Sequence, residues 1–357
     1  MRIRKHVIAA LALGGLASTH AWSQPAFDPA VVVGSLNSDQ ITEASGLGAS
    51  QRNPGVLWTH NDSGDSARVF AIDTMGRLLA TYNLPGVLAL DFEDMCMGPA
   101  PGGAWYVYVG DIGDNLAFRP SIAVHRFVEP AVSLSQWTAP TTQDAVGRES
   151  ITLLYPDGAK NAEGLAIDPA TGDLFVFTKQ SGTTRVYRGE AAALVNGATV
   201  TMSLVATFPL NLATAADIAP DGSLIIAKNL TSALVWSRSP GQTVGQAMSI
   251  AGTPAPVLVG ERQGEAVTFA HDLSGYYGVG ERLNAQVWFC ARVISCDPDM
   301  NGDGNVDQDD IECLVQAISG TPACLAPGAD ADFTGDGNVD QGDVEALQQV
   351  VGGQPCP

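Results

Sequence analysis

The sequence predicts an all-β propeller of about five four-stranded blades, followed by a small α-helical module. The propeller is indicated by a short motif that recurs five times between residues 43 and 267, each copy followed by a turn and an apolar segment. The module is indicated by an acidic twelve-residue segment that occurs at residues 299–310 and again at residues 332–343. The expected divisions of the chain are residues 1–23, 24–295 and 296–357.

Residues 1–23 have the organisation of a secretory signal peptide. Three basic residues within the first five precede an apolar run over residues 7–17, and Ala21 and Ser23 provide small side chains at a cleavage site before Gln24. The apolar run is too short to cross a bilayer as a helix, and no later stretch of the chain is long enough. We therefore expect a secreted protein, extracellular or on the cell surface, without a membrane span.

Each copy of the recurring motif begins a predicted blade. The five copies are centred on Ser45, Glu93, Glu163, Ala216 and Glu265, at spacings of 48, 70, 53 and 49 residues. Two further apolar segments follow each copy. A repeat of several strands and turns at such a period is typical of propeller blades. Fourth strands are expected at residues 78–82, 151–155, 201–208 and 256–259.

The fifth repeat lacks a fourth segment of its own. Residues 31–36 precede the first repeat and resemble residues 256–260. We expect residues 31–36 to close the ring as the missing outer strand, which would leave no open sheet edge. The longest interval leaves six blades open if residues 128–150 contain an irregular one. An open β-sandwich is the alternative architecture.

The predicted blades bring acidic residues to the axis of the ring, because the first strand of each blade lines the central channel. First strands carry Glu43, Asp91, Glu93, Asp94, Glu163, Asp217 and Glu265, and the ends of second strands carry Asp62, Asp111, Asp114, Lys179, Lys228 and Glu281. Unpaired like charges at a channel mouth are costly, so the arrangement indicates a metal or substrate site, with a further calcium ion as one candidate. The alternative is that these charges pair with one another and cap strand ends.

The candidate catalytic residues are few. Glu93 and Glu163 could act as acid and base, because two carboxylates at a suitable separation can hydrolyse a glycosidic bond. His60, beside Asn61 and Asp62, is the candidate general base. The chain has no nucleophile elbow, zinc-protease pair or phosphate-binding loop. Whether the propeller is an enzyme stays open from the sequence; if it is one, we expect a hydrolase.

Several short polar segments of the propeller region point to known propellers. They are residues 61–64, 110–115, 155–158 and 161–164, with Thr178 and Lys179. On these segments the region resembles secreted bacterial propellers of poorly assigned function. More remotely, it is similar to calcium-dependent propeller phytases and to esterase-like proteins near them, which implies metal-dependent hydrolysis of phosphoesters. A phytase needs basic phosphate-binding residues, for which the channel offers Lys179, Lys228 and Arg282.

The two acidic segments near the C-terminus have the composition of calcium loops. Both place oxygen-bearing side chains at positions 1, 3, 5, 9 and 12, and a glycine at position 6. Calcium takes six to eight oxygen ligands, and the glycine permits the sharp turn around the ion. Val306 and Val339 at position 8 are expected to join the loops. The helices that follow should each present one apolar face: Ile311, Leu314, Val315 and Ile318 in the first, and Val344, Leu347 and Val351 in the second.

These loop–helix repeats resemble the dockerin type I module, in which each of two units holds one calcium ion. Position 12 is aspartate in both loops, and no entering helix fits between Cys296 and the first loop, as in dockerins and unlike ordinary EF-hands. The resemblance implies calcium ligands at Asp299, Asn301, Asp303, Asn305, Asp307 and Asp310 for one ion, and at Asp332, Thr334, Asp336, Asn338, Asp340 and Asp343 for the other. It also implies a cohesin-like protein or another cell-surface component as partner.

One departure from the dockerin pattern concerns that partner. Dockerins present a small hydroxylic pair at loop positions 10 and 11, where this chain has Gln308 with Asp309 and Gln341 with Gly342. The alternative to cohesin docking is a self-contained appendage that calcium stiffens.

The charge and the cysteine content limit the possible partners and the compartment of the protein. The chain has 38 acidic and 18 basic residues, and residues 296–357 contain no lysine or arginine, which argues against nucleic acid as a partner. Six cysteines fit an oxidising compartment. Cys96 and Cys290 stand in apolar stretches and are expected to be buried thiols. The other four allow three disulfide pairings: Cys296, Cys313, Cys324 and Cys356.

Together these observations predict a secreted calcium-binding protein with a ligand-binding propeller. Its C-terminal module would tether or stabilise it. The competing expectation is a metal-dependent extracellular hydrolase that acts on phosphoesters or on polysaccharide.

Overall fold

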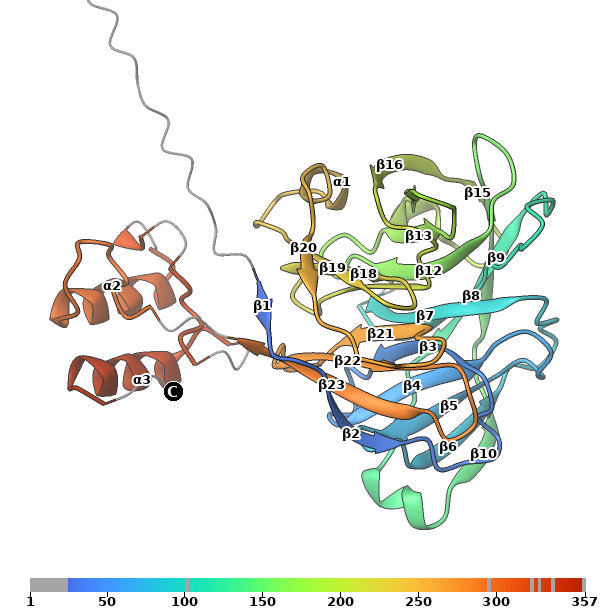
Figure 1. Cartoon of the computed structure of the whole chain (residues 1–357), viewed down its shortest axis with the longest axis horizontal. Helices are drawn as coiled ribbons and strands as arrows, with labels where there is room; N and C mark the ends of the chain where they lie inside the picture. Colours follow the sequence, from blue (N-terminus) through green and yellow to red (C-terminus); the bar gives the residue numbers. More distant parts are fainter. Residues whose placement is uncertain are drawn as a thin grey trace, which may run out of the picture.

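The computed structural model describes residues 25–99, 103–293, 297–321, 324–326, 329–334 and 338–354. The predicted signal peptide, Cys296, Cys356 and Asp336 lie outside these residues. Within them the chain forms five β-sheets and then two helices, α2 (Gln308–Ile318) and α3 (Gln341–Val351) (Figure 1). The predicted propeller with a small helical C-terminal module is therefore confirmed.

The innermost strand of each sheet belongs to one closed ring. These strands are β3 (Ala44–Ala49), β7 (Phe92–Pro99), β12 (Ala162–Ile167), β17 (Ala215–Ile218) and β21 (Ala266–Phe269). Each contacts the next in this order, and β21 contacts β3. Such a cycle is the arrangement of a propeller and not of an open sandwich. All five begin within or beside a copy of the recurring motif, which is why the motif marked the blades.

The other strands add outward from the ring in chain order. Second strands are β4 (Val56–Asn61), β8 (Trp105–Asp111), β13 (Leu174–Thr178), β18 (Leu224–Lys228) and β22 (Gly275–Val279). Third strands are β5 (Arg68–Asp73), β9 (Ile122–Val128), β14 (Thr184–Gly189), β19 (Ala233–Ser237) and β23 (Gln286–Val293). Fourth strands are β6 (Leu78–Asn83), β11 (Glu149–Leu154), β16 (Ser203–Phe208) and β20 (Thr253–Ala255).

The fourth strand of the fourth blade departs from its predicted place. It covers Thr253–Ala255, whereas residues 256–259 were expected. The pairing with β19 ends at Ala255, and the segment that follows begins at Pro256, which has no backbone N–H to donate. Val257 and Leu258 still pack against the core and explain the apolar pattern that suggested a strand there.

The N-terminal segment closes the ring as predicted. Strand β2 (Val31–Ser35) pairs antiparallel with β23 as the outer strand of the fifth blade, and β1 (Ala26–Phe27) extends the same edge. Gly34 lies where this strand meets the first blade, and a β-carbon there would be 2.1 Å from the carbonyl oxygen of Met75. Only glycine permits this approach, which joins the fifth blade to the first.

Residues 128–150 do not form a sixth blade. They contain a short 3₁₀ helix, η1 (Leu134–Thr138), and strand β10 (Thr141–Asp144), which pairs in parallel with β6 at the edge of the first blade. A comparable addition, β15 (Thr199–Thr201), pairs in parallel with β11. The long interval between the second and third copies of the motif therefore contains an edge strand, β10, that extends the sheet of the first blade. Two short helical segments elsewhere, η2 (Ala191–Ala193) and α1 (Val244–Ala247), lie in connections.

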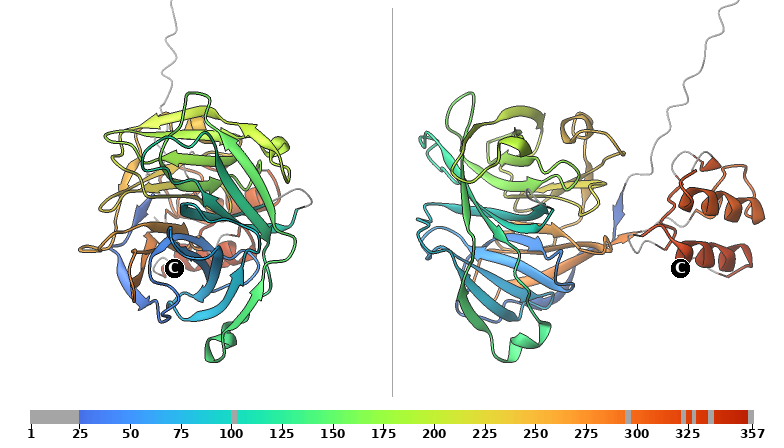
Figure 2. Two further views of the ribbon diagram at one scale, coloured as in Figure 1. Left: turned by 90° about the vertical axis from the view of Figure 1, so that its right-hand side faces the viewer. Right: turned by 180° about the vertical axis from the view of Figure 1, so that it is seen from behind.

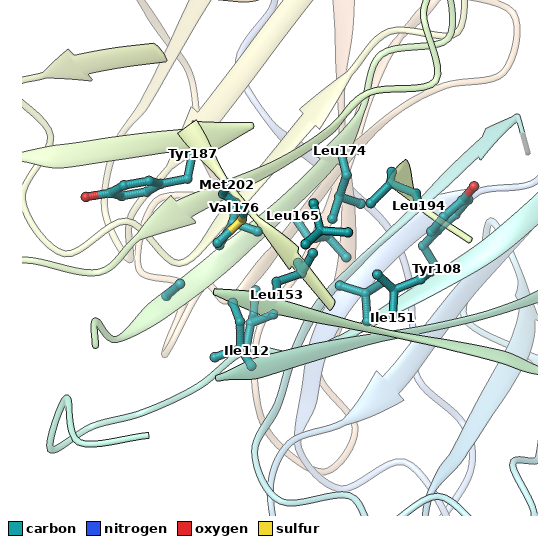
Figure 3. Close-up of a cluster of buried hydrophobic side chains, with 14 of the residues drawn as sticks. Tyr108, Ile112, Ile151, Leu153, Leu165, Leu174, Val176, Tyr187, Leu194 and Met202 are labelled. Atoms are coloured by element: carbon teal, nitrogen blue, oxygen red, sulfur yellow. The ribbon is translucent and has the colours of Figure 1, made fainter. Parts of the chain in front are cut away.

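The core consists of apolar layers between adjacent blades. Figure 3 shows one of them, where Ile151 and Leu153 of the second blade lie close to Leu165 and Val176 of the third. Trp58, Trp236 and Trp288 are fully buried in other layers. Cys96 and Cys290 are buried free thiols, as predicted. Each blade thus buries both faces, which explains the nearly continuous apolar runs of its inner strands.

Two buried carboxylates link the inner strands across blades. Asp94, with no exposed surface, accepts hydrogen bonds from the backbone N–H of Leu165 at 2.8 Å and of Ala216 at 3.0 Å, in the next two blades. Asp217 in turn accepts from the N–H of Phe269 at 2.8 Å and from the hydroxyl of Thr268 at 2.9 Å.

The hydroxyl group of Thr268 also forms a hydrogen bond with the first blade. Its oxygen accepts the N–H of Ala49 at 3.0 Å. These hydrogen bonds therefore connect β7 with β12 and β17, β17 with β21, and β21 with β3.

The helical module extends from the end of the last propeller strand. Figure 1 and the right-hand view of Figure 2 both show α2 and α3 beyond the end of β23, side by side and apart from the blades. Across the connection, Arg292 and Asp330 lie 3.8 Å apart. No helix among the described residues has the length and apolar character needed to cross a bilayer.

Asp94→Asn should lower the free energy of unfolding of the propeller by about 3 kcal/mol, because the amide nitrogen cannot accept the N–H groups that the carboxylate now accepts. Asp39→Asn, at an exposed turn, is the matched control and should change this free energy by less than about 0.5 kcal/mol. Chemical denaturation followed by tryptophan fluorescence measures both. Equal denaturation midpoints for the two variants would remove Asp94 from this role.

Candidate functional site

Antiparallel pairing gathers most of the candidate residues at one mouth of the channel. The start of each inner strand pairs with the end of the second strand, as in Ala44 with Asn61, Phe92 with Asp111 and Ala215 with Lys228. The residues at or just before the starts of the inner strands, and at or just after the ends of the second strands, therefore share this end. They are Glu43, Asp62, Asp91, Glu93, Asp111, Asp114, Glu163, Lys179, Lys228, Glu265 and Glu281.

Three carboxylates form the tightest group at this mouth. One oxygen each of Asp62, Asp91 and Glu93 lies within 4.8 Å of the other two. The N–H of Asp62 donates to the carbonyl of Glu43 at 2.8 Å, which holds the end of β4 against the start of β3. Asp91 fits because residue 113 is glycine, whose β-carbon would lie 2.4 Å from the Asp91 carboxylate. The neighbouring backbone thus positions two of the three groups.

Glu93 is the most enclosed member of the triad. It is buried, and the hydroxyl of Ser45 on the adjacent inner strand donates to it at 3.0 Å. Burial, followed by the charges of Glu163, Asp62 and Asp91, raises its pKa well above the ordinary value. Burial and the charge of Asp62 also raise the pKa of Asp91. Bringing these carboxylates together as anions therefore costs free energy that a bound cation would recover.

The remaining carboxylates extend the acidic mouth to the fifth blade. Burial, with Glu163 nearby, raises the pKa of Glu265 to about 7, and burial with Glu265 nearby raises that of Glu281 to about 7. Gln263 donates its amide to Glu281 at 2.6 Å. Glu43 is exposed at the rim.

The two lysines of this mouth differ in their exposure to solvent. Lys179, partly exposed, forms an ion pair with Glu163 and thereby opposes the rise that burial causes in the pKa of that glutamate. Lys228 has no exposed surface; it donates to the carbonyl of Gly264 and lies 3.7 Å from Glu261. Of these two lysines, therefore, Lys179 alone offers positive charge at the surface of the mouth, and Glu163 already pairs with it.

Asp111 and Asp114 organise the loop beside the triad. Asp111 forms an ion pair with Arg119 at 2.9 Å and accepts the N–H of Asp91 at 3.2 Å. Asp114 accepts the N–H of Arg119 at 2.7 Å. Arg119 and Glu261 could not be predicted from the recurring motif, because each lies outside it on a loop between blade strands.

Asp94 and Asp217 lie inside the ring and not at the mouth. Both carboxylates accept backbone hydrogen bonds from neighbouring blades, and burial raises the pKa of Asp217 to about 7. The pairing of β7 with β8 skips Asp94, as that of β3 skips Ser45 and that of β12 skips Glu163. The structural centre of the second repeat is therefore Asp94, one residue after the predicted centre at Glu93. The bulge interrupts the inward–outward alternation of side chains along β7, and the predicted alignment of the repeats assumed that this alternation was regular.

His60 is packed beneath the inner strands. It has no exposed surface, and Nδ1 lies 2.8 Å from the carbonyl oxygen of Asn61. Its ring packs edge-on against Phe92, and a β-carbon at residue 46 would be 2.6 Å from Nε2. Burial lowers its pKa. This position suits a packed histidine better than a general base that must reach a substrate in the mouth.

The first C-terminal loop coils around the side chain of its first residue. The carboxylate of Asp299 accepts the N–H groups of Gly302, Asp303 and Gly304 at 2.8, 3.1 and 2.9 Å. At position 12, Asp310 accepts the N–H of Asn301 at 3.1 Å and of Asp307 at 2.8 Å. Position 1 therefore holds the backbone of positions 4 to 6, and position 12 holds that of positions 3 and 9, so the segment has the coiled backbone of a calcium loop.

The second loop repeats the position-12 bonds. Asp343 accepts the N–H of Thr334 at 2.9 Å, its hydroxyl at 3.0 Å and the N–H of Asp340 at 2.8 Å. Asp340, like Asp307 in the first loop, caps the N-terminus of the following helix. Asp332 and Asn338 belong to the same loop. Thr334 therefore occupies the place of Asn301, with a hydroxyl in place of the amide.

The apolar join between the loops differs from the prediction. Val306 and Val339 at position 8 are 45% and 47% exposed, and Val315 of α2 is also exposed. Among the described loop residues, the buried apolar side chains are instead Met300 and Phe333 at position 2, which pack with one face of each helix. Ile311 and Leu314 of α2 and Val344 and Leu347 of α3 belong to the same buried cluster. The loops therefore contribute to this core through Met300 and Phe333 at position 2 and not through the valines at position 8.

One disulfide fastens the module. Cys313 on α2 bonds to Cys324 in the connection between the repeats, with their Cα atoms 5.5 Å apart. This is one of the pairings that the sequence left open. The proposed partners of the other bond, Cys296 and Cys356, lie outside the described residues.

Comparison with known proteins identifies this module. Residues 297–352 match the family model of the dockerin type I domain. A search among curated protein sequences finds no significant match to the chain. Dockerin domains bind calcium, so the match supports calcium as the metal of the C-terminal loops and a tethering role of the kind found in extracellular proteins. The chain therefore joins a five-bladed β-propeller to a C-terminal dockerin type I module.

Proposed function

We propose that the chain is a secreted, calcium-dependent binding protein. The acidic mouth of its propeller holds a divalent cation through Asp62, Asp91 and Glu93 and presents it to a ligand. The dockerin module, with one calcium ion in each loop, tethers the propeller to a cohesin-like or other cell-surface component. The observation that carries the proposal for the propeller is the convergence of three carboxylates within 4.8 Å of one another.

The separation of these oxygens suits calcium. Calcium–oxygen bonds are about 2.3–2.6 Å long, so two oxygens on opposite sides of one ion are at most ~5 Å apart. The triad stays within this limit. Its neighbours add negative charge, whereas Lys179 is already paired with Glu163. A divalent cation is the simplest group that offsets the repulsion without moving the backbone.

The dockerin module has the stronger requirement for an ion. Residues 296–357 carry thirteen acidic residues and no lysine or arginine. Its buried apolar core consists of only a few side chains around α2 and α3. Such a core is too small to offset the mutual repulsion of the carboxylates, so calcium binding and folding should be coupled.

Partner choice should depend on the exposed loop positions 10 and 11. Gln308, Asp309, Gln341 and Gly342 are all exposed at the start of the two helices. A long amide and a carboxylate in place of small hydroxyl groups change both the shape and the charge of this surface. We propose that the module recognises a partner adapted to these residues.

Hydrolysis is the second candidate function, and the electrostatics of two glutamates favour it. Glu93 has a strongly raised pKa and a hydroxyl partner, whereas Glu163 is paired with Lys179. Environments that separate the pKa values of two neighbouring carboxylates are typical of an acid and a base. Phosphoesters and oligosaccharides are the substrates to be tried.

Removal of calcium with a chelator should unfold residues 296–357 and leave the propeller folded. The reason is that the propeller has a large apolar core, whereas the module depends on its ions. Differential scanning calorimetry of the full chain should then lose its module transition and keep the propeller transition. A thermogram that the chelator does not change would contradict this coupling.

Asp303→Ala should weaken calcium binding to the module at least tenfold, whereas Asp309→Ala should change it less than twofold. Position 5 supplies a direct ligand, and position 11 is exposed and lies outside the ligand set. Both variants carry Asp91→Asn, so that the propeller site does not contribute. Calcium titration calorimetry of the full chain makes the comparison, and equal losses would show that the proposed ligand register is wrong.

Glu93→Gln should abolish the calcium site of the propeller, because the amide removes the negative charge at nearly unchanged size. Glu163→Gln, one blade away, should weaken that site only a fewfold. Titration calorimetry of the full chain should therefore lose one class of calcium sites with Glu93→Gln alone.

The same two variants distinguish binding from hydrolysis. A panel of phosphoesters and oligosaccharides, assayed with calcium present, should show no turnover by the unmodified protein if binding is the function. Turnover that both variants abolish, with unchanged melting temperatures, would replace the binding proposal with the hydrolase.

A further inference from the structure

A side pocket opens between the first and second blades, next to the acidic mouth. Its cavity is about 380 Å³, and its wall includes Leu88 and Leu90 from the β6–β7 connection, Ala123 and His125 from β9, and Thr152 from β11. We call this cavity the interblade pocket. It shares Leu90 and Arg119 with a second cavity of about 470 Å³ that Leu116 and Phe118 line. Both volumes are within the range of small-molecule sites.

Exposed apolar side chains are concentrated around these two cavities. Leu88, Leu116 and Phe118 are 75%, 79% and 71% exposed, and Leu90 is exposed beside them. The four lie on only two connections, β6–β7 and β8–β9. Single exposed apolar residues are ordinary, but a group of four around a cavity is typical of a site that covers them with a ligand.

His125 places an unused polar atom at the floor of the interblade pocket. Side chains of β9 alternate, so Val124 packs into the layer toward the third blade while His125 faces the first blade. The histidine is 8% exposed, and its Nε2 has no hydrogen-bond partner among the described residues. A buried polar atom without a partner is costly, which points to a ligand atom that would pair with it.

The hydrogen bonds at Nδ1 of His125 determine whether Nε2 is a donor or an acceptor. Nδ1 lies 2.8 Å from the hydroxyl oxygen of Ser150, which also accepts a hydrogen bond from Arg148. The hydroxyl proton of Ser150 is then free to point at Nδ1, and this assignment leaves the ring proton on Nε2. Burial lowers the pKa of His125 to about 4, so the ring is neutral. Nε2 therefore acts as a neutral hydrogen-bond donor.

The charges that line the pocket cancel. Asp111 and Arg119 form an ion pair at 2.9 Å, and Arg119 also donates to the carbonyl of Gly113 at 2.6 Å. Neither charge is left to attract an ion of the opposite sign. In this respect the interblade pocket differs from the mouth beside it, where carboxylates predominate.

We propose that the interblade pocket binds an uncharged, mainly apolar small molecule that carries one hydrogen-bond acceptor. Its apolar part lies among Leu88, Leu90 and Ala123, and its acceptor atom receives the proton of His125 Nε2. This site uses other residues than the cation triad, and its occupation does not depend on the calcium-binding proposal.

Ligand-detected NMR and titration calorimetry with the full chain test the chemistry of the site. Acetophenone, an uncharged aryl ketone, should bind, and ethylbenzene, which has nearly the same shape and no acceptor, should bind about fivefold more weakly. Benzoate and benzylammonium should both bind more weakly than acetophenone. Tighter binding of either ion, or no binding of acetophenone at millimolar concentration, would overturn the proposal.

Variants place the binding in the pocket. His125→Phe should lower acetophenone affinity about fivefold and leave ethylbenzene affinity unchanged, because it removes the donor and keeps an aromatic ring. Ala123→Phe fills the cavity and should abolish binding of both probes.

Leu88→Ser should weaken the binding of both probes. Leu283→Ser, at an exposed leucine in the fifth blade, is the matched control and should leave the binding of both unchanged. Melting curves select the variants that remain folded. Acetophenone binding that survives both Ala123→Phe and Leu88→Ser would assign it to another surface.

Discussion

The ring depends on hydrogen bonds that buried side chains make between the inner strands of different blades. A propeller has few main-chain bonds between blades, because each sheet satisfies its own ladder. Here Asp94 and Asp217 accept backbone N–H groups from neighbouring blades, and Thr268 continues the connection to the first blade. Burying a carboxylate costs several kcal/mol, and several N–H donors at hydrogen-bond distance offset that cost. The apolar layers hold blades face to face, whereas these bonds set the position of each inner strand along the axis.

The acidic mouth follows from this alignment. Because the inner strands start at one end of the axis, the acidic residues that precede them converge there, as do those that follow the second strands. Glu93 and Asp94 are adjacent in the chain and have opposite roles: one faces the mouth, and the other binds the backbone inside the ring. The same alignment buries Lys228 and leaves Lys179 as the exposed cation, paired with Glu163. The result is a mouth with more negative charge than its own basic residues can balance.

The two halves of the chain use carboxylates in the same two ways. In the dockerin module, Asp310 and Asp343 are buried and hold the loop backbone, while Asp303, Asp307 and Asp340 are exposed. In the propeller, Asp94 and Asp217 hold strands, and Asp62, Asp91 and Glu93 form the open triad. In both halves a few buried carboxylates fix the backbone that positions the others. The interblade pocket is a third environment, where Asp111 and Arg119 neutralise each other and a neutral histidine provides the polar contact.

The sequence by itself determined the blade repeat, the closing strand over residues 31–36 and the two calcium-type loops, because each is encoded by a local pattern of turns, apolar runs and spaced oxygens. It left the choice between five and six blades to residues 128–150, where the structure shows an edge strand. It could not separate Glu93 from Asp94, since a bulge in β7 breaks the alternation on which that distinction depends. Nor could it show that Val306 and Val339 are exposed while Met300 and Phe333 form the core of the module. Tertiary structure decided which carboxylates face one another, which lysine is buried, and that His125 shares a pocket with Leu88 and Leu90 of the β6–β7 connection. The physical reason is that the chemistry of a charged or polar side chain depends on neighbours brought together only when blades pack, whereas a repeat is encoded in the chain itself.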